Sequence, residues 1–430
     1  MNAPLNLEQL RKQAKELANE RRAEGVPAKL SDAQLELARR HGFASWPRLK
    51  QYVERLGAEQ PFHTDIDYYE GRAYGISTAQ GVSMAEARRD LAGRHGFSTW
   101  AGLRRHVEEL AAGAEPPPPF MLAYRAVEAD DGAELARLLD AHPELVAARG
   151  TNGNDLLGMA SSLEITRLML DRGADPNRGN DYGWTKLHQA GYGDWPEMAE
   201  VMLAAGGRTD LSARGDGGTP LIVALFWGHR RVTPLLGLEP RNLRVSAGLG
   251  LVDMIAELAG TPAAGAHRGF YRPHGGFPAW QPSDDPQEVL DEALTWAAKS
   301  GRIEAFRPLM DLGADVNADP YRGTPLTWAA VNGHTDAVRA LVDLGADVDR
   351  LATWGGPDHG GDVPAIKRRC AGRAGGRGAG AARPGRRSDD PRHDPRRGGR
   401  RVGGLRRSSR AGGVPPGARL RASPPGNSFP

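Results

Sequence analysis

The side chains of this sequence that could ligate a metal ion gather between positions 263 and 286. His267, His274, Asp284 and Asp285 offer the imidazole and carboxylate donors that zinc takes in proteins. Their spacing matches no metal-binding signature, and the single cysteine, Cys370, excludes a multi-cysteine zinc site. We therefore expect no metal site in this segment.

The sequence also lacks motifs that indicate catalysis. The Gly-Leu-Gly stretch at 248–250 lacks the third glycine and the preceding strand of a dinucleotide-binding turn. The sequence contains no GxSxG, HExxH or P-loop motif, and its lone cysteine lies in a segment of biased composition. The sequence predicts a non-catalytic protein that uses no cofactor.

The composition describes a soluble chain with an uneven distribution of charge. The 430 residues are 40% hydrophobic and 25% charged, and no apolar run reaches the roughly 18 residues of a membrane span. Residues 364–430 carry 18 of the 56 basic residues and three of the 53 acidic ones, so the first 363 residues have a net charge of −12. We expect a cytoplasmic protein whose acidic body binds neither a membrane nor nucleic acid.

A repeat with a period of about 33 residues organises the region 120–350. The motifs GADPN (173–177), GADVN (313–317) and GADVD (345–349) each follow an apolar helical segment. The motifs TKLH, TPLI and TPLT occur in phase with them. This spacing predicts units of two short helices each.

The clearest unit, 323–349, shows the physical role of each motif. Thr324 can cap the first helix, and Pro325 fits the first turn, where a missing N–H costs nothing. Gly333 and Gly345 can end the two helices, because glycine adopts the left-handed conformation that follows a helix. The unit therefore reads as helix, turn, helix and loop.

These motifs resemble the signature of the ankyrin-repeat family, of the type found in bacterial proteins. The resemblance covers about half of the chain. It implies an all-α fold, a solenoid of helix–turn–helix units joined by β-hairpin-like fingers. The clear copies lie at 182–213, 214–237, 288–319 and 320–350, and the degenerate ones at 122–146, 156–177 and 243–260.

The resemblance also implies a function, that of a protein–protein interaction scaffold. An unknown protein partner would bind on the concave face of the stack, through the finger tips and the inner helices. Repeat geometry places the following candidate contact residues at the fingers: Asp181, Tyr182, Trp184, Asp216, Tyr321 and Arg322.

An inserted loop at 263–286 interrupts the repeats. It carries aromatic and arginine side chains, which are enriched at binding hot spots, and insertions in solenoids often lie on the binding face. Phe270, Tyr271, Arg272 and Trp280 are therefore further candidates for partner contacts. The other open interpretation is a long loop that packs its own aromatic side chains over a gap in the stack.

The first 113 residues form a separate helical region with an internal duplication. The stretches 35–56 and 89–110 share the sequence HGF and a later Trp, and each predicts a helical hairpin that turns at Gly42 or Gly96. A DNA-binding helix-turn-helix is the alternative, but the second helices carry glutamates that repel DNA. The proline-rich segment 114–119 predicts a stiff linker to the repeats.

Residues 351–430 hold a broken repeat and a tail rich in Arg, Gly and Pro. Few large apolar residues occur after 364, so we expect this tail to be disordered. It provides the alternative function, a nucleic-acid-associated protein that binds through its arginines. Binding of that type normally interleaves aromatic residues, and the tail holds one, Phe429, so nucleic acid is the less favoured partner.

A frameshift is a further hypothesis for the tail. A GC-rich gene read out of frame yields Arg, Gly, Ala and Pro. One permitted coding of residues 386–397, read one base later, gives ADPTIRDTIHDG, whose Ala-Asp-Pro matches the repeat close at 173–177. The sequence favours a frameshift near 363–370 that replaced at least one further repeat.

Overall fold

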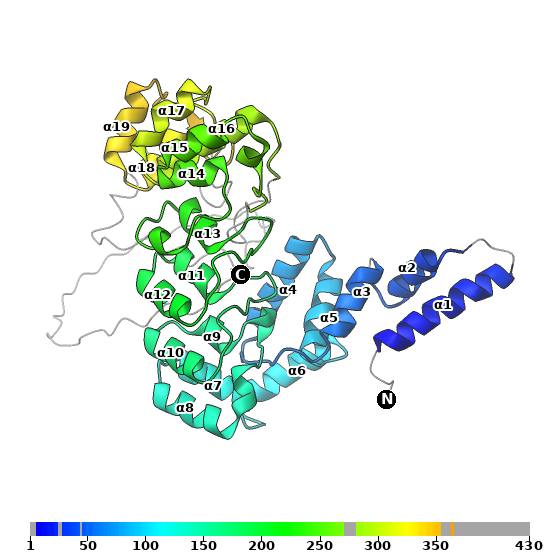
Figure 1. Cartoon of the computed structure of the whole chain (residues 1–430). Helices are drawn as coiled ribbons and strands as arrows, with labels where there is room; N and C mark the ends of the chain where they lie inside the picture. Colours follow the sequence, from blue (N-terminus) through cyan, green and yellow to red (C-terminus); the bar gives the residue numbers. More distant parts are fainter. Residues whose placement is uncertain (1–5, 25–27, 44, 271–280, 354–362, 365–430) are drawn as a thin grey trace, which may run out of the picture. The chain divides into compact units, whose positions relative to one another are not determined.

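The computed structural model describes residues 6–24, 28–43, 45–270, 281–353 and 363–364. Nearly all regular structure in these residues is helical, which confirms the predicted helical class at that level (Figure 1). The arginine-rich tail lies outside the described residues. No helix in the described ranges is long and apolar enough to cross a membrane.

Six helices form the N-terminal region, in two groups of three with separate apolar clusters. Gly42 and Gly96 have φ values of +80° and +81°, so both predicted turns need glycine. Thr99 caps the last helix by accepting from the N–H of Gly102, whereas Ser45 makes no such bond. The helices are α1 (Leu7–Ala23), α2 (Leu30–Arg40), α3 (Trp46–Glu54), α4 (Ile66–Gln80), α5 (Met84–Arg94) and α6 (Trp100–Ala111).

Helix pairs follow one another through the rest of the described chain, as the repeat period predicts. The pairs are α7 (Pro119–Glu128) with α8 (Gly132–Ala141), α9 (Leu156–Met159) with α10 (Leu163–Asp171), α11 (Lys186–Tyr192) with α12 (Pro196–Ala204), α13 (Pro220–Phe226) with the 3-10 turn η3 (Thr233–Leu235), α14 (Leu243–Leu249) with α15 (Val252–Leu258), α16 (Pro286–Lys299) with α17 (Phe306–Asp311), and α18 (Pro325–Val331) with α19 (Thr335–Asp343). Further 3-10 turns are η1 (Pro143–Val146), η2 (Thr151–Gly153), η4 (Pro262–Gly265) and η5 (Ile303–Ala305).

First helices of successive pairs pack against each other. Such contacts join α7 to α9, α11 to α13, α13 to α14, α14 to α16 and α16 to α18, in the order that Figure 1 shows. One apolar cluster runs from Phe62 to Trp328, and a second runs from Leu243 to Ala346. Each pair therefore buries its apolar side chains against its neighbours.

Asparagines in the GAD loops connect each loop to the next one. Asn177 donates to the carbonyl of Gly206, 3.0 Å away, and accepts from the N–H of Arg208 at 2.7 Å. Asn317 makes the equivalent bonds to Gly345 and Asp347, at 3.3 and 2.7 Å. The repeated motif is thus a connector between neighbouring pairs.

Three histidines also bridge neighbouring pairs, and two of them, His229 and His334, occupy corresponding repeat positions. The Nε2 of His188 donates to the carbonyl of Gly218 at 3.0 Å, while its Nδ1 accepts from the N–H of Thr185. His229 and His334 donate in the same way to the carbonyls of Tyr192 and Lys299. All three rings have structural partners.

The finger pattern continues beyond residue 350. Two short strands, β1 (Leu351–Ala352) and β2 (Val363–Pro364), pair antiparallel. Just after β1, both the N–H and the hydroxyl of Thr353 donate to the carboxylate of Asp319, at 2.7 and 2.9 Å. This hairpin is therefore bonded to the loop that precedes α18.

Acid should destabilise the fold through His188. Burial lowers the pKa of this ring to about 4, so between pH 6.5 and 4 the unfolded chain binds a proton that the folded chain does not. Stability is therefore lost as the pH falls through that window, by about 2 kcal/mol between pH 6.5 and 5. Urea unfolding of His188→Gln should show a smaller loss on acidification than the unmodified chain.

His142→Gln is the matched control, because the ring of His142 lies at the surface. Its loss of stability between pH 6.5 and 5 should equal that of the unmodified chain. An equal pH dependence for His188→Gln would contradict this role of the buried ring.

Candidate interaction surface

Asp181, predicted at a finger tip, forms ion pairs within the chain. Its carboxylate accepts from Arg94 at 2.7 Å and also from Arg55, both in the N-terminal region. The Asp181 side chain is 13% exposed. The structure thus places it at a junction between the N-terminal helices and the fingers, which the sequence does not indicate.

Tyr182 and Trp184 lie in the same finger and contact the next one. The guanidinium of Arg214 stacks 5.5 Å from the ring of Tyr182 and 5.0 Å from that of Trp184. Tyr182 is half-buried and Trp184 is 5% exposed. Tyr182 therefore offers surface to a partner, and Trp184 supports the arginine from beneath.

Asp216 is the most accessible of the predicted finger residues. Its carboxylate lies 3.0 Å from Nδ1 of His267, at the start of the inserted loop, and both side chains are more than half exposed. The backbones of these fingers approach closely, since a Cβ on Gly217 would lie 2.1 Å from the carbonyl oxygen of His267. The backbone that carries Asp216 and His267 is therefore tightly packed.

The structure places two other candidates in the interior. Phe270 and Tyr321 are buried, and their rings lie 6.4 and 6.3 Å from that of Phe226. Neither can contact a partner without a rearrangement of the core. Arg322 is half-buried at a positive φ of 55°.

The remaining candidates cannot be placed. Tyr271, Arg272 and Trp280 lie outside the described residues, as do His274 and Cys370. In the described ranges, no group of three His, Cys, Asp or Glu side chains is arranged to hold a metal ion.

Inner helices α13, α16 and α18 close onto one another around Lys299. The Lys299 amino group lies 3.8 Å from the ring of Trp328 and 4.1 Å from that of Phe226. The side chain of Asn332 donates to the carbonyls of Trp227 and Lys299, at 3.2 and 2.7 Å. The side chains of these three helices therefore fill the space between them.

Burial and the nearby carboxylates act in opposite directions on the pKa of this lysine. Burial lowers the pKa of Lys299 well below its usual value, although the carboxylate of Glu292 acts in the opposite direction. The aromatic rings partly compensate for the lost water, because their faces attract a cation. Lys299 is thus a buried structural group.

A buried ion network fixes both ends of the inserted loop. Arg268 donates to Glu292 at 2.6 Å, to Glu288 at 2.8 Å and to the carbonyl of Ser283 at 3.1 Å. Arg244 donates to the other oxygen of Glu292 at 2.8 Å. At its described ends the loop packs on the stack, which favours the self-packing interpretation for those residues.

Loss of the Glu292 charge should destabilise the chain strongly. Its carboxylate is buried between two arginines, so Glu292→Gln removes the negative charge that Arg244 and Arg268 share, at a cost of about 3–5 kcal/mol. Urea unfolding should show that loss, and trypsin should cleave after Arg268 more rapidly.

The exposed Glu257→Gln on α15 is the control and should change stability by less than about 0.5 kcal/mol. A Glu292→Gln variant as stable as this control would show that the network does not hold the loop.

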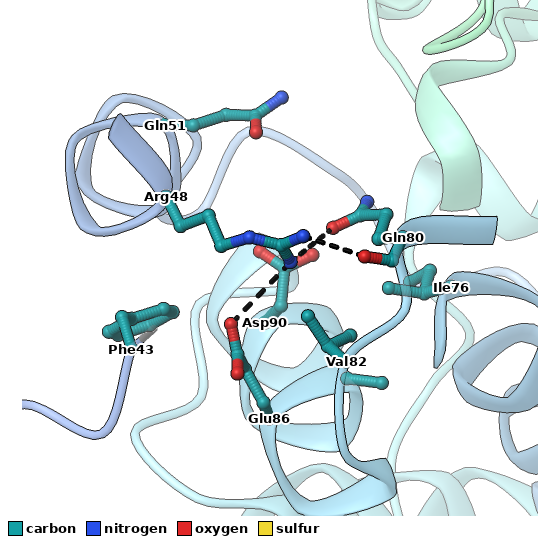
Figure 2. Close-up of a pocket in the computed structure, with 9 residues that line it drawn as sticks. Phe43, Arg48, Gln51, Ile76, Gln80, Val82, Glu86 and Asp90 are labelled. Carbon is teal, nitrogen blue, oxygen red and sulfur yellow. Dashed lines mark hydrogen bonds and ion pairs between the residues drawn. The ribbon is translucent and has the colours of Figure 1, made fainter. Parts of the chain in front are cut away.

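Figure 2 shows a small pocket between α3, α4 and α5, into which Arg48 points. Arg48 donates to the carbonyl of Gln80 at 2.7 Å and lies 3.7 Å from Glu86. Arg89 donates in turn to the carbonyls of His41 and Gly42. These arginines cap the ends of α2 and α4, so the pocket holds contacts that join the two groups of helices.

Three charged residues at the Asp181 junction are missed by the sequence argument. Arg55, Glu59 and Arg94 lie in the N-terminal region, and none belongs to a recognisable binding motif. Only the tertiary structure brings them to Asp181. The available signal is their place in or just after the two similar stretches, since Arg55 lies in the first, Glu59 follows it and Arg94 lies in the second.

Comparison with known families identifies part of this architecture. Residues 281–352 match the family described as ankyrin repeats (3 copies). None of the curated proteins compared with the chain matches it. The match confirms the predicted resemblance over α16 to α19, and for the earlier helix pairs the assignment stays a prediction.

Proposed function

We propose that this chain is a non-catalytic protein–protein interaction scaffold, an ankyrin-repeat solenoid over residues 120–350. The observation that carries the proposal is the accessible row of side chains across neighbouring fingers. Tyr182 with Arg214, and Asp216 with His267, form interlocked pairs on tightly packed loops. Such preorganised side chains lose little conformational entropy when a partner binds.

Ankyrin repeats generally mediate protein–protein interaction, and the family match at 281–352 supports that role here. The earlier pairs use the same connectors as the matched ones, since Asn177 and Asn317 make equivalent bonds to the following loop. This agreement supports one continuous array. We propose the cytoplasm as its location, because a single cysteine cannot form the internal disulfides common in secreted domains.

The proposed contact surface is narrower than the sequence suggests. Tyr182, Asp216 and Arg322 retain exposed area, so they stay proposed contact residues together with Arg214 and His267. The buried side chains, Trp184, Phe270 and Tyr321, support them from below. Because α13, α16 and α18 close onto one another, we place the partner on the finger tips.

Affinity capture with the full chain tests this assignment. Tyr182→Ala with Asp216→Ala should reduce capture of the partner at least tenfold, about 1.4 kcal/mol, because an aromatic anchor and a charge are lost together. The control carries Asp253→Ala and Glu257→Ala on the exposed face of α15 and should capture the partner normally. Capture lost in the control and kept in the finger variant would contradict the proposal.

We also propose that a frameshift near 363–370 truncated the array. Val363-Pro364 is the second of two paired strands, and Thr353, just after the first strand, is bonded to the loop before α18. Regular structure thus extends past the last helix pair, up to the proposed frameshift. The gene sequence tests this. Its neighbouring frame should continue with another repeat, and a neighbouring frame without one would refute the frameshift.

A further inference from the structure

An extended segment of the N-terminal region, residues 57–62, lies along the edge of the loop 149–153. The N–H of Gln60 donates to the carbonyl of Arg149 at 2.6 Å, and Gln60 forms a parallel β-bridge with Gly150. On its other side the segment is held by α5, since the N–H groups of Gly57 and Glu59 donate to carbonyls at the end of that helix.

The Glu59 side chain reaches into the loop as an anchor. One carboxylate oxygen accepts from the N–H of Asn152 at 3.1 Å, and the other accepts from Arg55 at 2.9 Å. The side chain is 1% exposed. The carboxylate is thus held by a backbone N–H of the loop and by an arginine of its own N-terminal region.

Phe62 provides a second anchor three residues later. Its ring lies 4.4 Å from that of Tyr124 and 6.0 Å from that of Phe120, both on α7. The ring also covers Gly150, where a Cβ would lie 2.7 Å from the Phe62 ring. The pocket for Phe62 therefore depends on α7 and on a glycine in the loop.

Together these contacts have the form of peptide recognition by a loop. One main-chain hydrogen bond aligns the extended segment with the loop, and separate pockets hold a carboxylate and an aromatic ring. We propose that the loop 149–153, with Phe120 and Tyr124, is a binding site for an extended peptide containing Glu-x-x-Phe. Residues 59–62 occupy this site within the chain and exclude such a peptide from another protein until they leave.

The charges around Glu59 favour release of its side chain from the loop. Glu59 shares Arg55 and Arg94 with the carboxylate of Asp181, so two negative charges are held near the same two cations. Burial raises the pKa of Glu59 to about 7, although Arg94 acts against it. When Glu59 leaves, Asp181 retains both arginines, and a carboxylate from another peptide can take the vacated place.

The test uses the full chain with Glu59→Gln and Phe62→Ala, and a fluorescent peptide of residues 55–65 (RLGAEQPFHTD). The peptide should bind this variant at least tenfold more tightly than the unmodified chain, whose site is filled. A control peptide with Lys for Glu59 and Ala for Phe62 should not bind. Binding that is equal in the two proteins, or equal for the two peptides, would overturn the proposal.

A second variant, Gly150→Val, separates occupation of the site from general unfolding. Its side chain collides with the place of Phe62, so the amide of Gln60 should exchange rapidly with deuterium while the peptide still fails to bind. In both variants the exchange of 281–353 should be unchanged. Phe62→Ala alone provides the decisive outcome. If this variant exchanges slowly over 281–353 and rapidly at the Gln60 amide, yet binds no peptide, the proposal is wrong.

Discussion

Short helices that cannot stand alone are the constraint on which this structure depends. The first helices α11, α13, α14 and α18 have seven residues each, well below the roughly 12–15 residues at which an isolated helix becomes marginally stable. Packing and polar bonds from neighbouring pairs must supply the difference. That stabilisation comes from the shared apolar clusters and from the hydrogen bonds of Asn177, Asn317 and the histidines.

Buried ion pairs occur where a segment is added to the series of helix pairs. Arg268 joins the ends of the inserted loop through Glu292, and Arg94 joins the N-terminal helices to the fingers through Asp181. Both arginines lie where the chain departs from a plain series of helix pairs. An ion pair inside a protein is costly unless its geometry is good, so these networks fix one arrangement of the added segments.

The inserted loop and the N-terminal region also share a consequence for binding. Both the inserted loop and the N-terminal region cover part of the repeats with their own side chains. A plain series of repeats would leave that part exposed. Phe270 packs over the inner helices, and Glu59 with Phe62 lies on the edge of the first finger. Of the candidate contact residues, Asp216 is exposed and Tyr182 is half-buried, so these two retain surface for the proposed contacts.

The sequence by itself predicts the helix pairs, their turns and the family of the last repeats, because these depend on local signals. Thr324 caps α18 and Gly333 and Gly345 take positive φ, as the motif requires. The sequence does not reveal that Asp181 pairs with Arg55 and Arg94, or that Lys299 lies among aromatic rings. Those contacts join residues far apart along the chain, and no local spacing encodes them. Tertiary packing alone decides which of the candidate residues stay exposed and which, such as Phe270 and Tyr321, become part of the core.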